Sequence, residues 1–282
     1  MKKLLLVLFL ACIANFSCSD DSSLKNEDGC IICGIEYFDG IENLSVHCNI
    51  SKIPECIGNL TSLKLLEIAW INLQELPESI GNLKNLEDLN ITGNNITALP
   101  STIGKLTNLK HFYSMGNLIN DLPDSFKDLD ALEDLDLSDN KFKSFPVDIY
   151  ELERLMLLDI SGDSISQLPN EFYLLSNLQV LKISRCGLNG FPESIGNLPE
   201  IQCIIAINNL MTNLPESIGN LKKLEFLYLS FNPLTSLPET IKNLKDNLKD
   251  LYLSNTNIPE ADRKIYESWL PKTNIHWTDD IG

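Results

Sequence analysis

Cysteine is the residue type in this chain with the clearest spacing for covalent or metal chemistry. Cys30 and Cys33 form a CxxC motif, and two more cysteines follow closely; the N-terminal cluster comprises Cys30, Cys33, Cys48 and Cys56. In a chain that is exported, four cysteines at one end predict two disulfides, and four cysteines allow three pairings between which the sequence does not choose. A zinc site and free thiols are the alternatives, because CxxC with two further thiols supplies four ligands.

The other chemically active residue types show no catalytic pattern. The three histidines, His47, His111 and His276, are far apart in the sequence, which leaves little for zinc-hydrolase chemistry. The motifs GxSxG, HExxH, GxGxxG and GxxxxGK[S/T] are absent from the sequence. We therefore expect no enzyme, no cofactor and no catalytic metal.

The charge balance restricts the kind of partner. The chain of 282 residues has 39 Asp and Glu against 22 Lys and Arg, a formal charge of −17. Such a chain repels phosphate backbones and anionic lipid surfaces, so nucleic acid is excluded as a partner. With 44% hydrophobic and 22% charged residues, the composition is that of a folded protein.

The N-terminus has the pattern of an export signal. A short basic start precedes an apolar run over residues 4–16, about 20 Å of helix and too short to span a bilayer. Of two candidate cysteines, Cys12 and Cys18, the second ends the apolar run and opens a polar stretch. This arrangement resembles a lipoprotein signal of the Bacteroidetes type. The resemblance implies a signal peptide over 1–17, lipidation of Cys18 and an outer-membrane or cell-surface location. Plain secretion is the alternative.

Prolines divide most of the remaining chain into equal segments. After the polar residues 18–29, which we expect to form a flexible tether, nine prolines follow one another at intervals of 23 residues. They are Pro54, Pro77, Pro100, Pro123, Pro146, Pro169, Pro192, Pro215 and Pro238. A fixed period of this kind indicates a solenoid, in which each repeat buries its apolar face only against its neighbours.

Each segment follows the pattern LxxLxLxxNxLxxLPxxIxxL, for example from Leu86 to Leu106. Alternating apolar residues predict a short strand, and the Ile and Leu after the proline predict one helical turn. The pattern resembles the leucine-rich repeat, in the subtype of Ras scaffolds and plant disease-resistance proteins. The resemblance implies an α/β right-handed horseshoe, with a parallel sheet on its concave face and short helical turns outside.

Position nine of the repeat is expected to form a polar ladder. Asparagine there can satisfy turn backbone groups through its amide. The ladder residues are Asn94, Asn117, Asn140, Asn209 and Asn232; other types stand at Ile71, Asp163, Cys186 and Thr256. We expect Cys186 and the downstream Cys203 to be free thiols, because repeat geometry places them about 20 Å apart.

Both ends of the solenoid, which covers residues 30–258, need caps. The N-terminal cap is expected at 30–44, where the cysteine cluster begins. The C-terminal cap is expected at 259–282, with a helix from Pro259 to about Trp269 that has Ala261, Ile265 and Trp269 on one face. The segment 274–277 is expected to lie along the last strand.

The variable positions three, five, seven and eight of the repeat face outward from the concave sheet, so function is expected there. Its middle is acidic, with Asp88, Asp134, Asp136 and Asp159. Asp136 and Asp159 are equivalent on adjacent strands, about 5 Å apart, where each raises the pKa of the other unless a cation intervenes. A basic protein or Ca²⁺ is the functional interpretation, and a solvated acidic face is the alternative. A glycosidase pair is rejected because an open sheet offers no cleft.

Towards the C-terminus the same positions become apolar and aromatic. The residues are Ile205, Ile207, Phe226, Tyr228, Phe231 and Tyr252. An exposed patch of this kind marks a contact surface, or else packs against the C-terminal cap. Trp70, Tyr113 and Met115 are isolated outliers.

We therefore predict a non-enzymatic recognition module at the cell surface that binds a protein through the concave face, attached to the membrane only by its lipid. A carbohydrate-binding surface lipoprotein is the alternative, because aromatic rings stack on sugars. Intracellular signalling, as in the Ras scaffolds, conflicts with the export signal.

Overall fold

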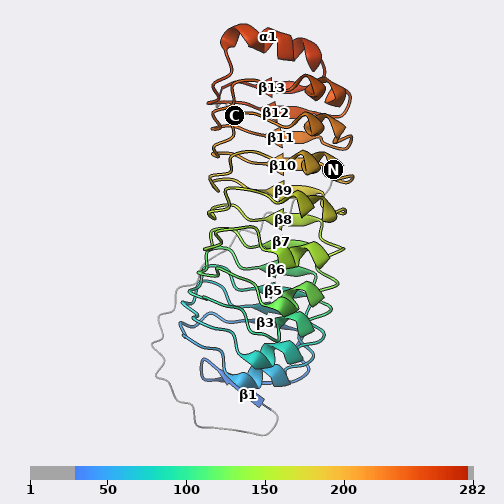
Figure 1. Ribbon diagram of the computed structural model, residues 1–282. Coiled ribbons are helices and arrows are strands. Elements are labelled where there is room, and N and C mark those ends of the chain that lie inside the picture. Colours follow the sequence, from blue (N-terminus) through green and yellow to red (C-terminus); the bar gives the residue numbers. More distant parts are fainter. Residues whose placement is uncertain (1–28, 279–282) are drawn as a thin grey trace.

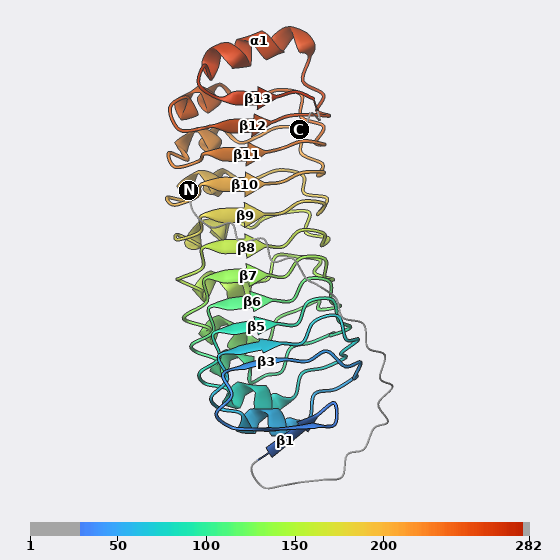
Figure 2. The same cartoon turned by 180° about the vertical axis from the view of Figure 1, so that it is seen from behind.

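Parallel strands, stacked repeat upon repeat, form the body of the molecule. Figure 1 shows the computed structural model, which describes residues 29–278. Within that range, β3 to β13 form an 11-stranded sheet in sequence order, and all neighbouring pairs are parallel. The strands lie on one side of an elongated stack and the short helical turns on the other (Figures 1 and 2). The expected α/β solenoid is confirmed.

The strands of the sheet are short, and in most of them a buried middle residue lies between two half-exposed ones. This alternation separates the core from the concave face residue by residue. The strands are β3 (Asn43–Ser45), β4 (Leu65–Glu67), β5 (Asp88–Asn90), β6 (His111–Tyr113), β7 (Asp134–Asp136), β8 (Leu157–Asp159), β9 (Val180–Lys182), β10 (Cys203–Ile205), β11 (Phe226–Tyr228), β12 (Asp250–Tyr252) and β13 (Asn274–His276).

Short 3₁₀ turns line the opposite, convex side. Except at η3, the repeat proline directly precedes each turn, with φ between −65° and −73°. Adjacent turns lie close together: a Cβ on Gly104 would stand 1.9 Å from the carbonyl oxygen of Ser125. The turns are η1 (Glu55–Asn59), η2 (Glu78–Asn82), η3 (Ile103–Lys105), η4 (Asp124–Asp128), η5 (Val147–Glu151), η6 (Asn170–Leu174), η7 (Glu193–Asn197), η8 (Glu216–Asn220) and η9 (Glu239–Leu244).

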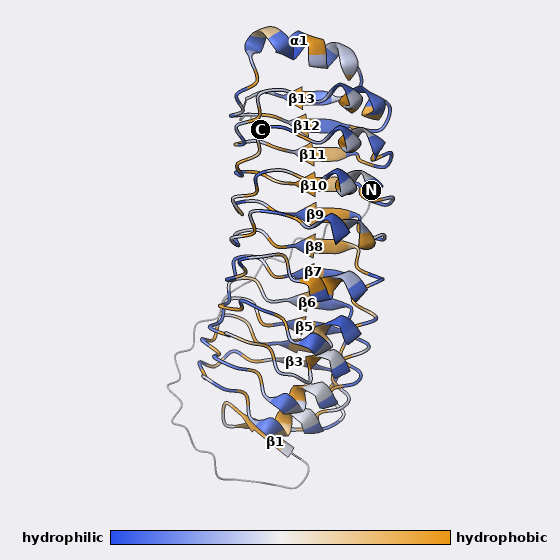
Figure 3. Ribbon diagram, in the orientation of Figure 1, coloured by the Kyte–Doolittle hydropathy of each residue, from blue (hydrophilic) through white to orange (hydrophobic). Residues whose placement is uncertain are grey.

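The core is a continuous apolar column between the sheet and the turns. The repeat leucines and isoleucines fill it; Leu89, Leu135 and Leu227, for example, are fully buried. Figure 3 shows the mixture of apolar and polar residues along each repeat. No helix within residues 29–278 is long and apolar enough to cross a membrane.

The asparagine ladder is present and connects each repeat to the one before it. The Asn94 Oδ1 accepts hydrogen bonds from the backbone N–H groups of Ile71 (3.2 Å) and Leu73 (2.9 Å). Its Nδ2 donates to the carbonyl oxygens of Ile68 (2.6 Å) and Ile91 (2.9 Å). The other ladder asparagines make corresponding bonds, so buried turn groups are satisfied by side chains.

In the middle of the ladder, two adjacent rungs have another residue in place of asparagine. Asp163, 4% exposed, accepts from the N–H of Phe142 at 2.8 Å through Oδ1. Within residues 29–278 its Oδ2 has no hydrogen-bond partner, and it stands where the other rungs have a donating amide. Burial raises the pKa of this carboxyl to about 7. At the next rung, the Cys186 thiol donates to the carbonyl oxygen of Ile160 at 3.2 Å, and burial raises its pKa to about 11.

The N-terminal end is closed by a disulfide-linked hairpin. β1 (Gly29–Ile32) pairs antiparallel with β2 (Ile35–Phe38). Disulfides join Cys30 to Cys56 and Cys33 to Cys48, with Cα–Cα distances of 5.0 and 6.0 Å. The first links the hairpin to η1 and the second links its turn to the loop after β3. All four sulfurs of the cluster are thus in disulfides, which leaves the zinc alternative without support.

The C-terminal end is closed by α1 (Glu260–Trp269) and by β13, which pairs with β12. The helix ends where expected, but of the expected apolar face only Trp269 packs against the core, partly buried, whereas Ala261 is exposed. Ile265 is 47% exposed, whereas Tyr266 and Leu270 are buried. The physical reason is a hydrogen bond: the Tyr266 hydroxyl reaches the edge of the last repeats and accepts from the N–H of Leu237 at 3.2 Å.

The Asp163 rung predicts a pH-dependent stability. Because the folded pKa of about 7 lies above the unfolded value of about 3.9, the folded state binds the extra proton. Stability is therefore fully present below about pH 4 and falls as the pH rises to about 7. Asp163→Asn removes this loss, so its free energy of unfolding should exceed that of the wild type by on the order of 4 kcal/mol above pH 7.

Urea unfolding of both proteins at pH 5 and pH 8 measures this difference. Asn140→Asp is the matched control, since it should introduce the same dependence at a regular rung. An equal difference between wild type and Asp163→Asn at both pH values would show that the carboxyl does not titrate in this range.

Candidate partner-binding face

The concave face consists of the outer residues of each strand, at positions three and five of the repeat, and of positions seven and eight in the turn that follows. Strand register aligns equivalent positions into rows: position five, for example, places Asp136 beside Asp159 and Asp159 beside Lys182. The middle strand residues point into the core. Residues on this face are consequently free to vary without loss of core packing.

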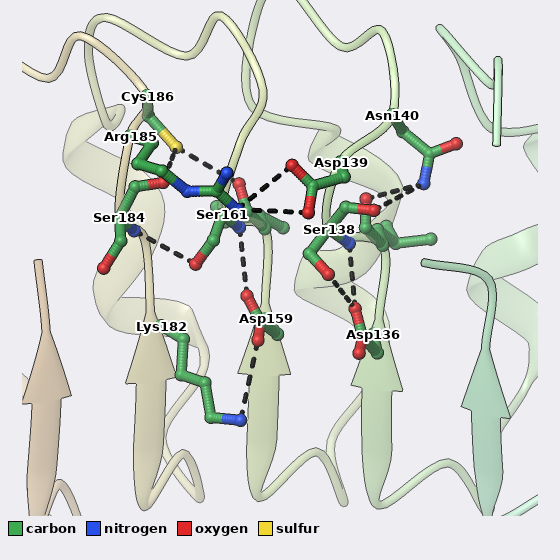
Figure 4. Close-up of polar contacts among 12 residues, drawn as sticks. Asp136, Ser138, Asp139, Asn140, Asp159, Ser161, Lys182, Ser184, Arg185 and Cys186 are labelled. Carbon is green, nitrogen blue, oxygen red and sulfur yellow. Dashed lines mark hydrogen bonds and ion pairs between the residues drawn. The ribbon is translucent and has the colours of Figure 1, made fainter. Parts of the chain in front are cut away.

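In the middle of the face, the structure brings Asp136 and Asp159 together as expected, and their carboxylates are engaged locally. The Asp136 Oδ1 accepts from the N–H and the hydroxyl of Ser138 at 2.9 and 2.6 Å. The Asp159 Oδ1 accepts from the N–H of Ser161 at 3.0 Å. Figure 4 shows both carboxylates bound at the ends of their own strands. Much of their hydrogen-bonding capacity therefore stabilises the turn that follows.

The interpretation of this pair as an open acidic site is incomplete. Asp159 is only 9% exposed, and Lys182 on the next strand places its Nζ 3.5 Å from the Asp159 Oδ2. Burial raises the pKa of Asp136; the Ser138 hydrogen bonds lower it, Asp159 raises it and Lys182 lowers it. The chain thus supplies its own cation.

A second internal ion pair joins two residues at position eight of the repeat, just after the strands. The Arg185 Nη2 donates to both Asp139 carboxylate oxygens at 3.1 Å, two repeats away (Figure 4). Gly162 lies between them, and a Cβ there would stand 2.1 Å from the Asp139 Oδ1. The glycine makes room for this contact, which the sequence-based interpretation missed.

The remaining carboxylates flank a histidine. His111 on β6 has its Nδ1 3.1 Å from the Asp134 Oδ2 and its Nε2 3.9 Å from the Asp88 Oδ1. Within residues 29–278 no group of three or more His, Cys, Asp or Glu is arranged to hold a metal ion. The Ca²⁺ alternative therefore has no support on this face.

At the C-terminal end of the face, aromatic rings stack on one another. The centroids of Tyr228 and Tyr252 are 4.5 Å apart, and those of Tyr252 and His276 are 4.0 Å apart, with interplanar angles of 10° and 5°. The neighbouring rings cover one another's faces, so the pile presents mainly ring edges to a ligand. This arrangement does not favour the carbohydrate alternative, which needs open ring faces.

The other predicted contact residues take different positions around this pile. Ile205, Ile207 and Phe226 are half-exposed on β10, after β10 and on β11. Phe231 is 48% exposed and has a positive φ of 59°. Other residues at position eight, such as Asp139 and Arg185, share this conformation. Phe231 therefore lies on the turn after β11 and not on a strand.

Sequence reasoning missed two apolar members of the face. Leu157 and Val180 occupy position three on β8 and β9, in register with one another, with Cys203 and with Phe226. Comparing position three across successive repeats, rather than scanning for aromatic residues, would have found them. Among residues 29–278, Cys186 and Cys203 are the cysteines outside disulfides, as predicted.

Comparison with known families agrees with the geometry. The family described as "Leucine-rich repeat region" matches residues 40–139, and "Leucine Rich Repeat" matches residues 177–198 and 223–244. The chain is a leucine-rich repeat protein. A search of curated protein sequences finds no match.

Solved structures share the fold. An LRR protein of Leptospira interrogans is 25% identical, with 84% of each chain covered and a TM-score of 0.52. A TDR receptor is 30% identical over 85% of this chain, with a TM-score of 0.70. The plant peptide hormone receptor RGFR1, in complex with RGF2, is 26% identical over 85% of this chain, with a TM-score of 0.69. The chain spans 43% and 40% of the lengths of these two receptors.

The internal cation of the face yields a prediction. Because Lys182 lowers the pKa of Asp136, Lys182→Met should raise that pKa further. Carboxyl-carbon NMR titration of the wild type and the variant measures the shift. Lys223→Met serves as the control, because Lys223 pairs with Glu200 elsewhere, and should leave Asp136 unchanged. An unchanged Asp136 titration in Lys182→Met would show that the lysine does not act on this carboxylate.

Proposed function

We propose that the protein is a non-enzymatic recognition module that binds a polypeptide partner through its concave face. The observation that carries the proposal is the division of one half-exposed sheet face into a carboxylate-rich half, with Asp88 and Asp134, and an apolar and aromatic half, with Phe226, Tyr228 and Tyr252. Such residues contribute nothing to the core, whereas exposed aromatic and apolar patches mark contact surfaces.

The likeness to a receptor solved with a peptide hormone supports the same proposal. An open sheet lined by side chains of several kinds suits a polypeptide, which offers charged and apolar groups along one strand. The proposed site comprises Asp88, Asp134, Asp136, Asp159, Ile205, Ile207, Phe226, Tyr228, Phe231 and Tyr252.

The double substitution Tyr228→Ala and Phe231→Ala tests the aromatic half. It should abolish capture of the partner in crosslinking from intact cells, because it removes exposed contact area, and should change thermal stability little. Tyr173→Ala is the matched control: Tyr173 is 44% exposed but lies on the convex turn η6. Loss of the same captured protein in both variants, or in neither, would count against the site.

We also propose that the protein is exported and held at the cell surface by a lipid on Cys18. The two disulfides support an oxidising compartment, and the sequence around Cys18 resembles a lipoprotein signal. The residues of that signal, 1–17, and Cys18 itself lie outside the described residues.

Metabolic labelling with an alkyne fatty acid in a bacterial host tests the anchor. Cys18→Ser should lose the label and release the protein from the membrane fraction, because the modified thiol is gone. Cys12→Ser, which alters a cysteine inside the signal, should keep the label. Label retained on Cys18→Ser would show that the lipid is not on Cys18, and no label on the wild type would leave plain secretion as the explanation.

A further inference from the structure

The concave face has an apolar row that the two halves described above do not explain. Leu157, Val180, Cys203 and Phe226 follow one another in register on β8 to β11 at position three. Each is half-buried and none belongs to the buried core. Beside them on position five stand Asp159, Lys182, Ile205 and Tyr228. Four consecutive repeats thus share a continuous apolar track.

A carboxylate closes the track at each end. Asp134 on β7 precedes Leu157, and Asp250 on β12 follows Phe226. Each is held by a histidine: His111 Nδ1 lies 3.1 Å from the Asp134 Oδ2, and His276 Nε2 lies 3.0 Å from the Asp250 Oδ1. The two aspartates are five strand steps apart, roughly 24 Å at about 4.8 Å a step.

The track suits an extended chain better than a compact ligand. One surface hollow is lined by side chains such as Lys127, Glu151 and Arg154, and another by side chains such as Lys222, Lys242 and Trp269. None of the lining residues is on a strand, so neither hollow is on the track. Neighbouring strands already pair their backbones, so a ligand must be recognised through side chains. An extended peptide advances about 3.4 Å per residue, and seven residues with long terminal side chains cover the distance between the aspartates.

Charge indicates which residues the peptide has at its ends. The cations beside the track are already paired: Lys182 with Asp159 at 3.5 Å, and Lys249 with Glu225 at 2.5 Å. The end carboxylates have histidines and, at Asp250, an Asn274 amide at 3.2 Å, but no lysine or arginine bridge among the described residues. A basic side chain from a partner complements them.

Resting on the proposed function, we propose that this track binds an extended polypeptide segment with Lys or Arg about six positions apart and apolar residues between them. The apolar side chains lie along Leu157, Val180, Cys203 and Phe226. The basic side chains reach Asp134 at one end and Asp250 at the other.

Selection from a phage-displayed library of random peptides, about nine residues long, tests the proposal with the whole protein immobilised. The selected peptides should be enriched in Lys or Arg at this spacing, with aliphatic or aromatic residues between. Val180→Glu should weaken their binding about tenfold or more, because it places a charge in the middle of the track. Asn197→Glu adds the same charge on the convex turn η7 and should leave binding unchanged.

The end contacts have their own variants. Asp134→Asn and Asp250→Asn should each reduce affinity and also reduce its dependence on salt, since each removes one ionic contact. Acidic or purely apolar selected peptides, no enrichment at all, or binding insensitive to Val180→Glu would overturn the proposal. Light scattering that shows a dimer dissociated by Val180→Glu would assign the track to a second copy and also overturn it.

Failure of this inference is distinguishable from failure of the proposed function. If crosslinked capture from cells depends on Tyr228 and Phe231 while the library yields no basic–apolar–basic peptides, the concave face still binds a protein. In that case the partner is a folded surface rather than an extended segment.

Discussion

A single 23-residue repeat cannot bury its own leucines, and this constraint governs the rest of the structure. Each strand supplies one inward residue, and each convex turn supplies one or two more, so the apolar column closes only when repeats are stacked. The polar ladder follows from the same stacking. Once the turns are buried, their backbone groups need partners, and the amide of Asn94 or Asn140 satisfies groups of two repeats at once. The first and last repeats each have an apolar face without a neighbouring repeat, so a cap must cover each end.

The same constraint leaves the concave face available for recognition. Because each strand gives its middle residue, at position four, to the core, position three can change from Asp134 to Leu157 to Asp250 without disturbing the stack. On such a face, the side chains that interact are those at equivalent positions of neighbouring strands, and not those that are neighbours in the sequence. In this way His111 contacts Asp134, Asp159 contacts Lys182, and Tyr252 stacks on His276, although each pair is more than 20 residues apart in sequence.

Much of this could be predicted from the sequence, because the repeat pattern determines which side of the sheet each residue faces. The strands, the ladder, the paired Asp136 and Asp159 and the two free cysteines all follow from position in the repeat. Contacts that skip a repeat, or that join a repeat to a cap, do not follow from the repeat pattern. The reach of Arg185 over Gly162 to Asp139 depends on rotamers and on the space a glycine leaves. The disulfide pairing depends on how the irregular N-terminal cap lies against the first repeats, and the Tyr266 hydrogen bond on how the C-terminal helix lies against the last ones.

The Arg185–Asp139 bridge lies beside the two rungs where the ladder departs from asparagine. Its ends belong to the repeats of Asn140 and Cys186, and it passes over the repeat of Asp163. In a linear array, cooperativity is transmitted only between nearest neighbours, so a weakened rung is where the column would separate into two folding blocks. The Arg185–Asp139 ion pair links the repeats on either side of the Asp163 repeat from outside the core. An ion pair on the surface therefore joins repeats that are two apart, which the asparagine ladder, linking each repeat to the one before it, does not do.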